Sequence, residues 1–126
     1  MRSYLFGFLA LSLFLTVSVG AWEPEGAFEP EALTWLKEEC PPDFFAAKPR
    51  FSVRRVERLV RRLYAAGALE VKAARMLGEF AGLRVFLPLH PERRRDIISL
   101  VNKRRAECSL VSVGDTGQEE IVLWFC

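Results

Sequence analysis

The chain has 126 residues, of which 18 are basic and 16 acidic, and it carries a formal net charge of +2. This length leaves room for one domain with a single core and excludes two domains. The charge is unevenly placed, because residues 22–43 carry seven acidic groups against one lysine, whereas residues 44–126 carry 16 basic and nine acidic groups. We therefore expect the acidic N-terminal segment to fold over the basic body, and we do not expect a nucleic acid as partner.

Residues 1–21 have the pattern of an export signal. Arg2 supplies a positive charge, residues 4–19 hold no charged side chain, and residues 19–21 offer the small side chains that signal peptidase recognises before a cut. This apolar stretch of 16 residues is shorter than the ~20 that a membrane-spanning helix needs. We expect cleavage after Ala21 and a secreted or periplasmic protein. The alternative is a membrane-anchored protein whose signal stays uncleaved, because a single basic residue is a weak start for a signal.

Residues 22–51 are predicted to form an acidic leader, a short helix and a linker. Pro30 is well placed to open the helix, which would run to residue 39 and end before Pro41 and Pro42. Trp35 and Leu36 would dock this helix on the rest of the domain. Residues 43–51 are rich in phenylalanine and are expected to form an ordered apolar linker.

The clearest predicted element is an amphipathic helix that follows Ser52. Ser52 suits the N-cap position, and Gly67 suits the position just after the helix. Apolar residues recur at helical spacing along one face, namely Val56, Leu59, Val60, Leu63 and Tyr64. The opposite face carries five arginines, namely Arg54, Arg55, Arg58, Arg61 and Arg62.

The remaining residues predict two hairpins on either side of a second helix. Strands over residues 69–77 and 83–89 would be joined by a turn at residues 78–82, which hold two glycines. His90 and Pro91 would start a helix that ends near residue 107. A second hairpin would then pair residues 109–113 with residues 120–125 through a turn at residues 114–119.

These elements predict an αββαββ domain of the α+β class over residues 52–126. One helix–strand–strand unit alone would leave its apolar face in water, whereas two such units can close one core. We therefore expect a two-layer α/β sandwich with a four-stranded, mainly antiparallel sheet of ferredoxin-like character. The extra N-terminal helix would pack at its side or end.

The three cysteines predict one disulfide and one remaining thiol. If the last hairpin pairs Val113 with Ile121, the same register sets Cys108 opposite Cys126. Cross-strand neighbours lie close enough for a disulfide, and the enclosed loop would stabilise the fold by about 3 kcal/mol. Cys40 is then either a buried free thiol or the site of an intermolecular or alternative disulfide. No metal site is expected, because no CxxC or HxxxH spacing surrounds the cysteines or the single histidine.

The segment Asp115-Thr116-Gly117 matches the catalytic triplet of aspartic proteases. Its two neighbours depart from the usual apolar and small residues, and the nine residues that follow are too few for the strands around such a site. A hairpin turn is therefore favoured.

His90 is the only histidine and precedes a helix-opening proline, so a capping role suits it better than acid–base catalysis. The sequence also holds no phosphate-binding glycine loop, and we expect no cofactor.

We therefore predict a non-catalytic interaction module of the cell envelope or extracellular space. The five-arginine face, reinforced by basic runs at residues 93–95 and 103–105, would bind an acidic protein, an acidic glycan or lipid headgroups, because planar guanidinium groups suit such anions. The lack of interleaved aromatic residues argues against nucleic acid. Two alternatives are a small hydrolase or protease-like enzyme that uses Asp115 and His90, and a structural envelope protein that dimerises through Cys40 or an exposed sheet edge.

Overall fold

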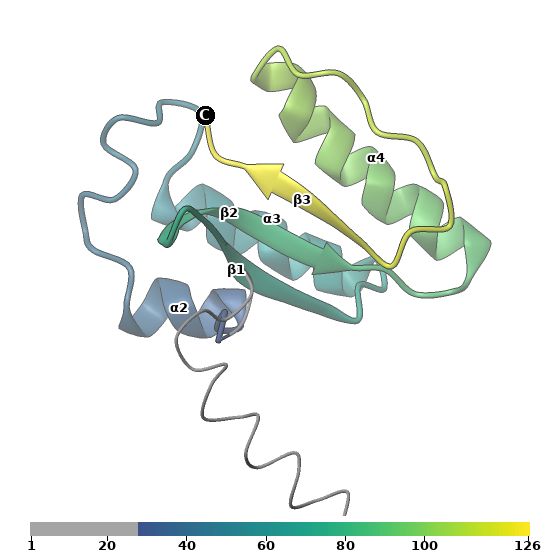
Figure 1. Cartoon of the computed structure of the whole chain (residues 1–126), viewed down its shortest axis with the longest axis horizontal. Coiled ribbons are helices and arrows are strands. Elements are labelled where there is room, and N and C mark those ends of the chain that lie inside the picture. Colours follow the sequence, from purple (N-terminus) through teal and green to yellow (C-terminus); the bar gives the residue numbers. More distant parts are fainter. Residues whose placement is uncertain (1–27) are drawn as a thin grey trace, which may run out of the picture.

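The computed structural model describes residues 28–126, so the predicted export signal at residues 1–21 lies outside the described residues. In the described part, the chain forms α2 (Ala32–Glu38), α3 (Val53–Ala65), β1 (Glu70–Met76), β2 (Glu79–Phe86), α4 (Pro91–Glu107) and β3 (Glu120–Trp124). The strands make one antiparallel sheet in the order β1-β2-β3. The predicted α+β class is therefore confirmed, with three helices and three strands among residues 28–126 (Figure 1).

Local capping chemistry sets the ends of the two long helices. The Ser52 hydroxyl accepts a hydrogen bond from the backbone N–H of Arg55 at 3.1 Å, and Gly67 follows α3 with a φ of 113° that suits glycine. At the start of α4, the Nδ1 atom of His90 accepts from the backbone N–H of Arg93 at 3.4 Å, and Pro91 occupies the first helical position. The predicted start and stop of both helices are confirmed.

The core lies between the helices and one face of the sheet. Alternate strand residues on this face are buried, namely Val71, Ala73, Leu83, Val85, Ile121 and Leu123. Helix α3 contacts β1, α4 contacts β3, and α2 contacts both α3 and β1 (Figure 1). Trp35 of α2 and Phe45 and Phe51 of the linker belong to the same buried cluster. Residues on both sides of position 52, the predicted start of the domain, therefore share one core.

A buried carboxylate ties the N-terminal segment to the sheet. The side chain of Glu29 is fully buried and accepts hydrogen bonds from the backbone N–H of Arg75 and from Nε of Arg84, both at 2.7 Å. Arg84 also reaches Glu120 of β3 at 2.6 Å. Burial raises the pKa of Glu29, but the hydrogen bonds and charges of Arg84 and Arg75 together lower it below its usual value. One acidic group of the N-terminal segment thus pairs with the basic body.

The first hairpin is confirmed, but its turn differs from the prediction. Strands β1 and β2 pair up to Met76 and Glu79, so Leu77 and Gly78 alone form the turn, with φ values of 54° and 85°. Positive φ at both central residues is the geometry that suits the twist of a two-residue hairpin. Gly82 lies inside β2 instead, where a Cβ atom would overlap the carbonyl oxygen of Leu123. This glycine serves the close approach of β3 rather than a turn.

The predicted fourth strand at residues 109–113 is absent, so the four-stranded sheet of ferredoxin-like order is a wrong prediction. Helix α4 takes the backbone groups that a strand would have used. The side-chain amide of Asn102 donates to the carbonyl of Val113 at 2.9 Å and accepts from its N–H at 2.8 Å. Nε of Arg105 donates to the carbonyl of Val111 at 2.8 Å. The segment therefore runs along α4 and does not pair with β3.

Candidate functional site

The five arginines of the predicted binding face all lie exposed on α3, but they do not form one surface. Arg61 points toward α2, whereas Arg55, Arg58 and Arg62 point toward α4. Arg54 lines neither hollow. The helix thus divides the predicted face between two different neighbours, and each side has its own electrostatics.

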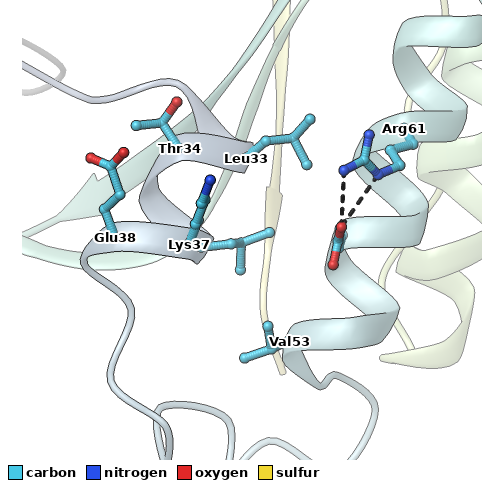
Figure 2. Close-up of a pocket in the computed structure, with 8 residues that line it drawn as sticks. Leu33, Thr34, Lys37, Glu38, Val53 and Arg61 are labelled. Carbon is cyan, nitrogen blue, oxygen red and sulfur yellow. Dashed lines mark hydrogen bonds and ion pairs between the residues drawn. The ribbon is translucent and has the colours of Figure 1, made fainter.

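The side toward α2 is a hollow of about 390 Å³ with mixed charge (Figure 2). Figure 2 shows Lys37 on α2 and Arg61 on α3, while Glu38 extends from the side of α2 that faces away from α3. The guanidinium of Arg61 pairs with Glu57, one turn earlier on the same helix, at 3.0 Å. This pair is exposed and contributes little to stability, but it partly neutralises Arg61. The hollow therefore offers no concentrated charge of one sign.

The side toward α4 is strongly basic. We call this side the α3–α4 groove, which has a volume of about 300 Å³. It is lined by Arg55, Arg58, Leu59 and Arg62 of α3 and by Arg104 and Glu107 of α4. Nη1 of Arg104 lies 3.0 Å from both carboxylate oxygens of Glu107. The three arginines of α3 have no carboxylate within ion-pair distance among residues 28–126. Four guanidinium groups thus face one carboxylate.

The basic runs that were expected to reinforce the arginine face contribute one residue to it. Arg104 lines the groove, whereas Arg105 is held at the carbonyl of Val111. Arg94 is buried at a different place on α4. The sequence pointed to Arg104 only as part of the basic run at residues 103–105, and it did not point to Glu107. Arg104 and Glu107 are three residues apart on a predicted helix, and this spacing indicates a local ion pair. It does not indicate that α4 lies beside α3.

Arg94 engages the aspartate of the Asp-Thr-Gly segment. Its Nη2 atom lies 2.7 Å from Oδ1 of Asp115 and 2.9 Å from the carbonyl of Gln118, while Nη1 donates to the carbonyl of Pro88 at 3.0 Å. The hydrogen bond from Arg94, together with one from the N–H of Gly117, lowers the pKa of Asp115. These contacts hold the loop before β3 against α4. Asp115 has a structural role there, and His90 has one as the cap of α4.

The predicted disulfide is confirmed. Cys108 and Cys126 are bonded, with 5.9 Å between their Cα atoms. The structural context of the bond differs from the prediction. Cys108 caps the end of α4 and does not lie in a strand opposite Cys126. The disulfide holds the C-terminal turn of α4, which carries Arg104 and Glu107, to the segment after β3. It thereby fixes one wall of the α3–α4 groove.

Cys40 is a free thiol in this structure. It is half-buried, packs against the core, and lies 3.5 Å from the carbonyl of Pro41. Burial raises its pKa, so at neutral pH the thiol form dominates and reacts slowly.

Within residues 28–126, no helix is long and apolar enough to cross a membrane. In the same part of the chain, no cluster of three or more His, Cys, Asp or Glu residues could hold a metal ion. The chain matches no known protein family, and neither a curated protein nor a solved structure is significantly similar to it.

Proposed function

We propose that this chain is an exported, non-catalytic interaction module that binds an acidic partner through the α3–α4 groove. The observation that carries the proposal is that Arg55, Arg58 and Arg62 line one concave surface without a carboxylate partner among the described residues. The disulfide between Cys108 and Cys126 supports an oxidising compartment, such as the periplasm or the extracellular space.

Electrostatics explains why an anion would bind in this groove. Guanidinium groups without a carboxylate partner on successive turns of one helix repel one another, and an anion between them would relieve that repulsion. Each group presents a planar set of donors that matches carboxylate, sulfate or phosphate oxygens. Because the groove is open to solvent and salt, a single contact contributes little to binding. We therefore expect a partner with several negative charges and an affinity that falls as salt rises.

The experiment measures binding of the protein to an immobilised acidic peptide, an acidic glycan and anionic lipid vesicles. A variant with Arg58→Glu and Arg62→Glu should lose binding to every acidic surface that binds the wild-type protein. The matched control carries Arg54→Glu and Arg61→Glu, which change the net charge equally but lie outside the groove. Both variants should keep the wild-type Tm, because all four side chains are exposed. Equal binding by wild type and groove variant, or no binding by the wild type, would refute the proposal.

A second candidate function is dimerisation through the free edge of β3. The N–H of Phe125 donates to the carbonyl of Ala81, and the N–H of Leu87 donates to the carbonyl of Glu119. The backbone N–H and C=O groups of odd-numbered residues in β3 therefore face β2. Because β3 is an edge strand of the sheet, the alternate backbone groups at residues 120, 122 and 124 face away from β2, and no strand pairs with them in the described part of the chain. Such an edge can pair with the same edge of a second copy.

The mass in solution, measured by light scattering with and without reductant, tests this candidate against a disulfide through Cys40. A dimer that survives reduction supports the strand edge, and a dimer lost on reduction supports Cys40. A monomer under both conditions rules out dimerisation by either route at the concentration used.

A further inference from the structure

We infer that the ligand of the α3–α4 groove is a linear acidic polysaccharide, bound along the axis of α3. This inference rests on the proposed function and narrows its partner to one chemical class. Three features of the groove carry it: the spacing of its arginines, its two helical walls, and the single carboxylate in one of them.

The spacing of the arginines matches a chain of repeated charges. Arg55, Arg58 and Arg62 follow one another at intervals of three and four residues along α3. At a rise of about 1.5 Å per residue, these intervals correspond to roughly 4.5 and 6 Å along the helix axis. Steps of this size are comparable to the length of one sugar unit, so successive acidic units of a chain can each meet one guanidinium. A single small anion would use only part of this row.

The shape of the groove separates a chain from a flat surface. Helix α3 supplies one wall, and the last turn of α4, with Arg104 and Glu107, supplies the other. Leu59 lies between the walls, but its side chain is almost fully buried, so charged side chains form most of the surface that a ligand would meet. A narrow chain can lie between the two helices, where arginines from both walls can reach it. The headgroup plane of a bilayer would contact the rim only.

Glu107 separates a polysaccharide from other linear polyanions. Arg104 partly neutralises this carboxylate, but its oxygens still accept hydrogen bonds and repel phosphate, so its presence in the wall disfavours an unbroken row of anionic groups. An acidic sugar carries hydroxyl donors beside its acidic group and can satisfy both Glu107 and the arginines. Polyphosphate has no such hydroxyls. The residues that line the groove include no aromatic ring, so the bases of a single-stranded nucleic acid would find no stacking surface.

The test measures affinity by calorimetry for oligogalacturonates of one to six units and for heparin-derived oligosaccharides of matched length. The first series carries carboxylates and the second also carries sulfates, so the two arms identify the acidic group. Affinity should rise with length and level off after about three units, because the row of three arginines spans roughly 10 Å. Polyphosphate and oligo(dT) of equal charge should bind more weakly than the preferred glycan.

Three single variants locate the site. Arg58→Gln removes the central charge and should weaken glycan binding about fivefold or more, whereas Arg54→Gln, its matched control outside the groove, should change it less than about twofold. Glu107→Gln should strengthen polyphosphate binding more than glycan binding, and so reduce the preference for the glycan. The Tm of each variant, compared with that of the wild type, verifies the fold.

Several results would overturn the inference. One is monosaccharide binding as tight as that of the longest oligomer, and another is tighter binding of polyphosphate or oligo(dT) than of either glycan series. An equal loss from Arg54→Gln and Arg58→Gln would show diffuse attraction with no groove. If neither glycan series binds while the acidic peptide or the vesicles bind through the groove, the proposed function stands and the polysaccharide assignment fails. If no anionic surface binds, both fail.

Discussion

Glu29→Gln tests how far one buried charge holds the N-terminal segment to the sheet. The substitution keeps the size of the side chain but removes the charge that faces Arg84. The carboxylate accepts three hydrogen bonds: 2.7 Å from the N–H of Arg75, and 2.7 and 3.2 Å from the guanidinium of Arg84. Breaking a buried ion pair by removing one partner costs about 3–5 kcal/mol. Because Arg84 keeps its contact with Glu120, we expect a loss of about 2–4 kcal/mol in the free energy of unfolding.

The dependence of this loss on pH provides a second readout. The pKa of Glu29 is lower in the folded chain than in the unfolded chain, where it takes its usual value. The ionised carboxylate therefore contributes its full stability above the unfolded pKa, and this contribution disappears as the pH falls through the folded pKa. Urea unfolding followed by tryptophan fluorescence should show a constant difference between wild type and variant around pH 7 and a shrinking difference toward about pH 3.

Glu120→Gln is the matched control, because Glu120 contacts the same guanidinium at 2.6 Å but its side chain is 39% exposed. Solvent screens that pair, so its loss should cost less than about 1 kcal/mol. The reasoning is refuted if the two variants lose equal stability, or if the loss from Glu29→Gln is the same at about pH 3 as at about pH 7.

Three further variants test other contacts. Replacing Cys108 and Cys126 by serine should lower the free energy of unfolding by about 3 kcal/mol, because the bond closes a loop over a sequence separation of 18, and reductant should produce the same loss in the wild type. Leu77→Asn should stabilise the chain by up to about 1 kcal/mol, since Leu77 is 93% exposed at a φ of 54° and asparagine tolerates that conformation better. A lower Tm for this variant would contradict the strain argument. Asp115→Asn should lower the Tm, because it weakens the anchor to Arg94. The hydrolase alternative requires it to abolish a measurable activity instead.

Much of the local structure could be predicted from single segments of the sequence. The ends of α3 and α4 follow from Ser52, Gly67 and the His90-Pro91 pair, because capping depends on groups within one turn of the helix end. The first hairpin follows from its two apolar runs, although the prediction from its two glycines put the turn at the wrong residues. A glycine serves a turn and a close approach between strands equally well, and only the position of β3 decides between them.

The arginine face shows the same limit at the candidate site. Periodicity alone placed all five arginines on the outer face of one helix, which is where they lie. Which of them act together depends on the elements beside that helix. Glu57 pairs with Arg61, and α4 brings Arg104 to the other side. The groove is a product of helix packing, and no spacing within α3 predicts it.

By itself, the sequence determined the α+β class and the boundaries of α3 and α4, whereas it predicted the bond between Cys108 and Cys126 from a strand register that the structure does not contain. These depend on local chemistry and on hydrophobic period, which act over a few residues. Only the tertiary structure decided the number of strands. The predicted fourth strand lost its backbone partners to Asn102 and Arg105 of α4. The tertiary structure also decided the burial of Glu29 and the charge of the α3–α4 groove. Such long-range contacts depend on which elements pack together, and side-chain bonds between distant segments leave no periodic pattern in the sequence.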